Sequence, residues 1–130
     1  KLDLRDNNLS GPIPDSIGNL ENLSWLYLGE NNLSGPIPDS IGNLSNLEGL
    51  NLWDNNLCGK VPRSFMFTWP TGVPSGFIFE YNNLLTEGYS PAMTNWLADT
   101  DFPFGAQDSE ECKNVPHEED DGFDPDRGGF

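Results

Sequence analysis

The chain has 130 residues, the size of one ordinary domain, and a formal net charge of −15. That charge argues against binding to nucleic acid or to an anionic membrane surface, because both require a basic protein surface. The charge is concentrated at the C-terminal end, where residues 99–130 hold 11 acidic and 2 basic residues. No signal peptide and no apolar run long enough to span a bilayer is found.

The N-terminal half of the chain consists of internal repeats. Residues 2–25 and 26–49 are identical at 18 of 24 positions, a third copy begins at Leu50, and a fourth is recognisable from Phe77 to Leu85. Each copy opens with a short alternation of apolar and polar residues, which predicts a strand with one buried face. The glycine and prolines that follow exclude a regular helix through the turn.

Stacking of the copies would bury the apolar residues that a single copy must expose. We expect a ladder of apolar side chains, and beside it a ladder of asparagines whose carboxamides bond to backbone groups of neighbouring turns. The asparagines lie at spacings of 24, 24 and 27 residues, and no further repeat is found after the fourth copy. The apolar ladder comprises Leu4, Leu28, Leu52 and Phe79, and the polar ladder Asn7, Asn31 and Asn55, while Asn82 sets the phase of the fourth copy.

The repeated motif LxxLxxLxLxxNxLSGxIPxxIGN resembles the plant-type leucine-rich repeat of receptor-kinase ectodomains, polygalacturonase-inhibiting proteins and grass ice-recrystallisation inhibitors. The resemblance implies an α/β repeat solenoid, with parallel strands on one face and irregular or 3-10 turns on the other. We therefore predict repeats over residues 1–85, an irregular C-terminal cap over 86–112 and a flexible acidic tail over 113–130. No cap precedes Lys1, so the first coil is expected to present an open apolar edge.

The resemblance also implies a pairing for the two cysteines. Cys58 stands in an LCG sequence, which plant-type repeat proteins often pair with a later cysteine of the cap, so a Cys58–Cys112 disulfide is expected. Such a crosslink contributes roughly 4 kcal/mol in the chain-entropy model, and two free thiols are the alternative. The cysteines and the N-glycosylation sequons together indicate an extracellular protein, secreted or at the cell surface. The sequons are at Asn8, Asn22, Asn32 and Asn43.

No catalytic constellation is found, and we predict neither enzymatic activity nor a cofactor. The single histidine, His117, lies in the acidic tail without an ordered partner. The tail is interpreted as a solubilising charge run, with weak calcium binding as an alternative, although its acids lack the spacing of an EF-hand loop. The acids concerned are Asp120, Asp121, Asp124 and Asp126.

The outward positions of the strands hold the candidate binding site. Reading across the copies predicts an aromatic cluster on this face, which would lose little conformational entropy on contact with a partner. The acidic residues beside it would suit a basic partner or a cation. The alternative is that the cap or tail folds back over these aromatics. The candidate residues are Trp25, Tyr27, Glu30, Asn51, Trp53, Asp54 and Tyr81.

The sequence favours a recognition module that binds a protein, peptide or cell-wall glycan through this strand face. A second hypothesis is structural: the open first coil would accept another copy head to tail and so build a fibril. A third is inhibition of ice recrystallisation, for which the regular flank with Ser10 and Ser34 offers only two full repeats.

Overall fold

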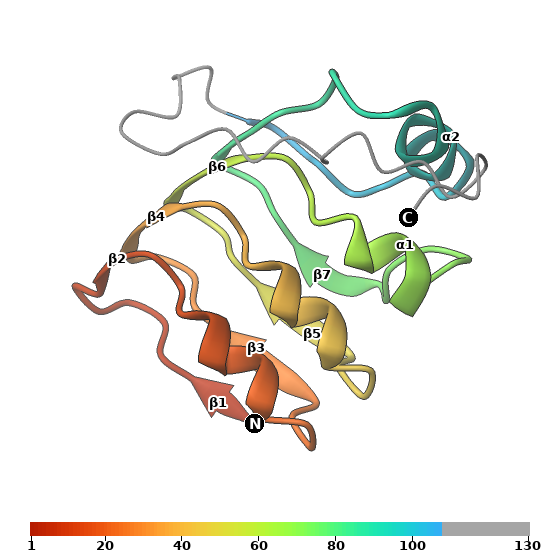
Figure 1. The fold of residues 1–130 in the computed structure, drawn as a ribbon. Coiled ribbons are helices and arrows are strands. Elements are labelled where there is room, and N and C mark those ends of the chain that lie inside the picture. Colours follow the sequence, from red (N-terminus) through yellow and green to blue (C-terminus); the bar gives the residue numbers. More distant parts are fainter. Residues whose placement is uncertain (108–130) are drawn as a thin grey trace.

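The computed structural model describes residues 1–107, in which the chain winds into a stack of coils (Figure 1). Each coil opens with a strand of the first parallel sheet, in the order β1-β3-β5-β7, and contributes a second strand to another parallel sheet, in the order β2-β4-β6-β8. The first sheet comprises β1 (Leu2–Asp3), β3 (Trp25–Tyr27), β5 (Gly49–Asn51) and β7 (Gly76–Ile78). The second comprises β2 (Ser10–Gly11), β4 (Asn32–Gly35), β6 (Asn56–Gly59) and β8 (Asn83–Leu84).

The strand register follows the sequence repeat. Leu26 lies opposite Leu50, 24 residues further along the chain, so equivalent residues of successive copies stack directly. Leu50 in turn lies opposite Phe77, and the longer third copy is accommodated without any change of register. The predicted solenoid with parallel strands is therefore confirmed.

The other side of each coil is helical. The first two coils form the 3-10 helices η1 (Asp15–Asn19) and η2 (Asp39–Asn43), as predicted, each directly after a proline with extended backbone. The third coil forms a short α-helix instead, α1 (Ser64–Thr68). Met66 stands there in place of the glycine of the earlier copies, and methionine is a much better helix former than glycine.

The apolar ladder lies at the centre of the stack. Leu52 and Phe79 are fully buried, whereas Leu4 is 37% exposed because it belongs to the first coil and is covered on one side only. The helical side packs as closely as the strands do: a Cβ atom at Gly18 would lie 2.7 Å from the backbone oxygen of Ser40 in the next coil. Glycine at this position is therefore required by the spacing of the coils.

The predicted asparagine ladder is confirmed. Asn55 donates hydrogen bonds to the carbonyls of Leu28, in the preceding coil, at 3.0 Å and of Leu52, in its own coil, at 3.2 Å. Its Oδ1 accepts a hydrogen bond from the backbone N–H of Leu33 at 3.0 Å. Asn31 and Asn82 repeat this pattern one coil before and one coil after. Each carboxamide thus satisfies backbone groups that no strand partner reaches.

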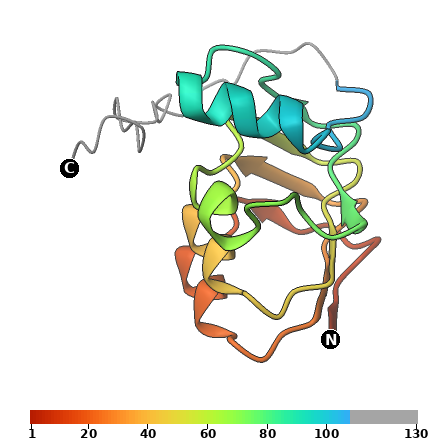
Figure 2. The same cartoon turned by 90° about the vertical axis from the view of Figure 1, so that its right-hand side faces the viewer.

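The segment after the fourth copy is more regular than predicted. It contains the helix α2 (Pro91–Asp99), which Ser90 caps and which has proline at its first position. Met93 and Trp96 of this helix are buried, and the Trp96 indole N–H donates to the carbonyl of Trp69 at 3.1 Å. Figure 2 shows α2 lying across the end of the last coil, which it seals.

The prediction that no repeat follows Leu85 is corrected by residues 102–107. Gln107 donates to the carbonyls of Phe79 and Phe104, both at 2.7 Å, and its Oε1 accepts from the backbone N–H of Leu84 at 3.0 Å. These are the bonds that the asparagines make in earlier coils. The chain therefore returns after α2 as the start of a fifth coil, with glutamine 25 residues after the last ladder asparagine.

Candidate functional site

The predicted binding residues lie on the outer surface of the first sheet and at the ends of its strands, a surface that we call the strand face. Four of them are half-buried, namely Trp25, Tyr27, Asn51 and Trp53, and three are exposed, namely Glu30, Asp54 and Tyr81. Among residues 1–107 the cap lies over the end of the stack, and Tyr81, in the last full coil, stays 44% exposed. The described part of the cap thus leaves the face open.

The aromatic rings form two edge-to-face pairs, where the sequence predicted one cluster. Trp25 and Tyr27 have ring centroids 6.0 Å apart with planes at 63°, and Trp53 and Tyr81 have centroids 6.0 Å apart with planes at 79°. The Trp25 indole extends across Gly49 of the neighbouring strand, where any Cβ atom would overlap it. The two pairs mark two halves of the face.

The first half contains its own cations. The Arg5 guanidinium lies 4.6 Å from the centroid of the Tyr27 ring and the Lys1 ammonium 5.1 Å from it. Arg5 also forms an ion pair with Asp3 at 2.6 Å. That hydrogen bond lowers the pKa of Asp3 to about 2, and the same contact raises the pKa of Arg5. A cation, a carboxylate and an aromatic ring are thus combined within the first coils.

Acidic residues border both halves of the face. Glu30 and Asp54 occupy equivalent positions in successive coils, and both have left-handed backbone with φ of 57° and 56°. Asp6 and Tyr81 repeat this conformation at φ of 55° and 59°. At these positions the chain turns from the strand into the asparagine ladder. Left-handed backbone costs a residue other than glycine of order 1 kcal/mol, and aspartate tolerates it better than most residues. The turn itself therefore favours Asp6 and Asp54, whereas it does not account for Glu30 or Tyr81.

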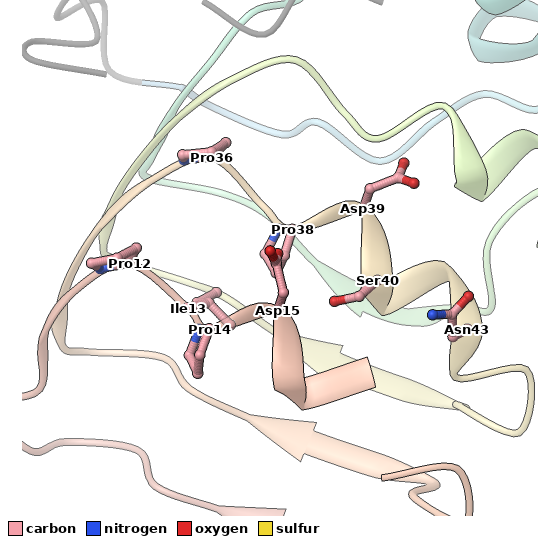
Figure 3. Close-up of a pocket in the computed structure, with 9 residues that line it drawn as sticks. All are labelled: Pro12, Ile13, Pro14, Asp15, Pro36, Pro38, Asp39, Ser40 and Asn43. Carbon is pink, nitrogen blue, oxygen red and sulfur yellow. The ribbon is translucent and has the colours of Figure 1, made fainter. Parts of the chain in front are cut away.

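A groove on the opposite flank runs between the first two coils (Figure 3), with a volume of about 570 Å³. Asp15 and Asp39 at its rim open the two 3-10 helices. Two further pairs of equivalent residues from the two copies line it, Pro12 with Pro36 and Pro14 with Pro38. Ile13, Ser40 and Asn43 complete the lining.

The remaining predicted sites are placed as follows. All four sequon asparagines, Asn8, Asn22, Asn32 and Asn43, are exposed, as attachment of a sugar requires. Cys58 is buried in β6 at 3% exposure, while Cys112 lies outside the described residues, and the disulfide stays a prediction. The proposed calcium ligands of the tail also lie outside them. Within residues 1–107 no group of three or more His, Cys, Asp or Glu side chains is placed to hold a metal ion.

Comparison with known proteins assigns the chain to a class. A family model described as Leucine rich repeat matches residues 1–66. The chain therefore belongs to the leucine-rich repeat family. Its repeats are of the plant type, which the motif indicated and which the similar solved structures confirm. No match is found among curated proteins. In the described region no helix has the length and apolar character needed to cross a membrane.

The similar solved structures include plant receptors. The crystal structure of PEPR1-AtPEP1 is 33% identical with a TM-score of 0.64, over 82% of this chain and 14% of that chain. The Arabidopsis receptor kinase HAESA, solved with the peptide hormone IDA and the co-receptor SERK1, is 30% identical with a TM-score of 0.61, over 89% and 19%. A plant ice-binding protein is 33% identical with a TM-score of 0.55, over 64% and 26%. This chain thus spans about a quarter or less of each of these structures.

Proposed function

We propose that the chain is a non-enzymatic extracellular recognition module, which binds a protein, peptide or cell-wall glycan through its strand face. The observation that carries this proposal is the pair of aromatic contacts on outward positions. The fold does not need aromatic residues there, because the position of Trp53 is taken by Arg5 in the first coil and by Gly29 in the second. Half-exposed aromatic pairs on a rigid sheet are typical of binding surfaces.

The similar structures support the same function. HAESA is described in complex with a peptide hormone, and the GASSHO1/SCHENGEN3 receptor is described as a leucine-rich repeat ectodomain in complex with CASPARIAN STRIP INTEGRITY FACTOR 2. Their shared fold and ligand binding favour a protein or peptide partner for this chain. Similarity to a receptor ectodomain favours a location outside the cell for this chain.

The experiment is a binding screen of the full glycosylated chain against synthetic peptides and cell-wall oligosaccharides. The proposal expects Trp53→Ala and Tyr27→Ala to weaken whichever ligand binds. Phe67→Ala is the matched control, because Phe67 is 55% exposed and lies on α1, away from the strand face. A ligand that is lost in the Phe67 variant and kept in both others would contradict the proposal.

The fibril and ice hypotheses have weaker support. Leu4, Leu9 and Leu20 of the first coil are exposed, but a longer solenoid exposes such leucines wherever it is divided, so they do not favour assembly. Similarity to an ice-binding protein covers 64% of this chain, and the flank with Ser10 and Ser34 still offers only two full repeats. Native mass by light scattering tests the fibril directly, since a monomer excludes it.

A further inference from the structure

We propose that the second half of the strand face binds an arginine side chain of a basic peptide segment, between the Trp53–Tyr81 ring pair and the carboxylates of Asp54 and Glu80. This inference rests on the proposed function and adds the chemistry of the partner. The partner is an extended peptide, because the face is built from short parallel strands and offers a shallow surface.

The first half of the face shows how such a cation is held. Arg5 places its guanidinium 4.6 Å from the centroid of the Tyr27 ring while pairing with the Asp3 carboxylate at 2.6 Å. The planar guanidinium suits both contacts at once, since it stacks on an aromatic face and forms forked hydrogen bonds with a carboxylate. Two coils further along, aromatic and acidic residues are again neighbours in the chain, although at other positions: those equivalent to Asp3 and Tyr27 hold Asn51 and Ile78.

Trp53 and Tyr81 belong to adjacent coils and lie next to acidic residues in the chain. Asp54 follows Trp53, and Glu80 precedes Tyr81. The two pairs meet across the sheet, because the backbone N–H of Asp54 donates to the carbonyl of Glu80 at 3.1 Å. The backbone segments that carry the two carboxylates are therefore adjacent to those that carry the two rings. Asp54 is exposed and Glu80 is half-buried over Gly105.

The described chain provides no cation for this half of the face. Between residues 1 and 107 each basic side chain is placed elsewhere: two lie over Tyr27, one lies over Tyr89 and one precedes α1 on the helical side. These are Lys1, Arg5, Lys60 and Arg63, in that order. Nor are the acids grouped to hold a metal ion. Charge complementarity therefore favours a basic side chain of a partner.

Arginine fits better than lysine. A guanidinium is planar and less strongly hydrated than an ammonium, so it loses less on entering a half-buried aromatic site. Gly29 occupies the position beside Trp53 in the preceding coil, and the Asn51 carboxamide lies over it, since a Cβ atom there would be 2.7 Å from Asn51 Oδ1. The Trp53 and Tyr81 rings pack edge to face, with planes at 79°, so their faces point in different directions and a planar guanidinium can approach either face.

The test uses the full glycosylated chain and blocked peptides of alternating glycine and arginine, lysine or glutamine, with affinities measured by tryptophan fluorescence and calorimetry. We expect the arginine peptide to bind about tenfold more tightly than the glutamine peptide, with lysine between them. The Asp54→Asn/Glu80→Gln double variant should weaken the arginine peptide by about three- to tenfold. Trp53→Leu should weaken it further, with thermal unfolding used to confirm that the variant is folded.

The matched control is Asp15→Asn/Glu21→Gln, which removes the same charge from exposed positions off the strand face. If this variant weakens the arginine peptide as much as Asp54→Asn/Glu80→Gln does, only the overall negative charge is acting and the inference is wrong. If the glutamine peptide binds as tightly as the arginine peptide and both depend on Trp53, the face binds ligands without selecting a cation. That result refutes the inference and leaves the proposed function intact. If neither the probe peptides nor any ligand from the screen need Trp53 for binding, the inference and the proposed function are both wrong.

Discussion

The asparagine ladder gives a prediction whose size follows from the structure. Asn82 is fully buried and connects two coils: its Nδ2 donates to the carbonyl of Leu52 at 2.8 Å, and its Oδ1 accepts from the backbone N–H of Leu57 at 3.0 Å. Replacement by alanine leaves both groups without these bonds, in an environment that excludes water. A buried orphaned polar group costs about 1–3 kcal/mol, so with two such groups Asn82→Ala should lower the free energy of unfolding by about 2–6 kcal/mol.

The first rung provides the control. Asn7 makes bonds of 3.0 and 3.1 Å to the carbonyls of Leu4 and Arg5, but it is exposed, so water can replace its carboxamide. Asn7→Ala should therefore cost less than about 1 kcal/mol.

Urea unfolding followed by tryptophan fluorescence measures both variants of the ladder. The signal is suitable because Trp69 and Trp96, near the cap, are only 8% and 6% exposed. The two variants compare one side chain in two environments, so propensity changes largely cancel. An Asn82→Ala cost no larger than that of Asn7→Ala would refute the view that the ladder stabilises the stack by satisfying buried backbone groups.

Three further predictions concern single contacts. Burial raises the pKa of Tyr89 from 10.0 to about 12. Because the folded state favours the protonated phenol, the protein loses stability as pH rises between those two values. Tyr89→Phe should therefore flatten the profile of unfolding free energy between pH 10 and 12. An unchanged alkaline profile would contradict this. Arg5→Gln should return the pKa of Asp3 from about 2 toward 3.8, as followed by carboxyl NMR. The ion pair stabilises the folded protein above pH 3.8, and this contribution is lost as pH falls toward 2. A pKa of Asp3 that stays near 2 in the variant would exclude Arg5 as the cause. Gly49→Ala should displace the Trp25 indole from the sheet at a cost of about 1–3 kcal/mol, seen as a change in fluorescence and in the unfolding midpoint, and an unaltered spectrum would mean that the indole does not lie there.

The solenoid could be predicted because its residues recur at fixed spacing. A leucine or asparagine that repeats every 24 residues can be buried in only a few ways, and stacking in register is the simplest of them. The repeat could not predict the helix α2, because the segment that forms it does not follow the 24-residue period. Its own signals are local: Ser90 and Pro91 mark a helix start, and Ala92, Met93, Trp96 and Leu97 form one apolar stripe.

The fifth coil could not be predicted from the repeat consensus, because its residues differ from the consensus leucines and asparagine. The segment Phe102-Pro-Phe104 keeps the apolar alternation of the strands, and Gln107 replaces the asparagine with the same amide on a longer side chain. The chemistry is retained while the letters differ, so a search for leucine and asparagine does not find it.

The candidate site was predictable in position and not in detail. Alternation along the strands identifies which residues point outward, and those residues do lie on the strand face. Which rings pair depends on side-chain rotamers and on neighbours such as Gly49, over which Trp25 extends. The cations over Tyr27 were missed for the same reason, because Lys1 and Arg5 belong to another coil.

The junction between coils has a consequence for how such a chain can change its length. The bond from a backbone N–H of one coil to the amide oxygen of the next measures 3.1, 3.0, 3.0 and 3.0 Å at four successive junctions, the last of them made by Gln107. Each coil therefore offers its neighbour the same connector. Duplication or loss of a whole coil leaves each remaining coil with a partner for this hydrogen bond. Evolution can therefore lengthen or shorten the stack one coil at a time, while the outward residues of each coil vary independently.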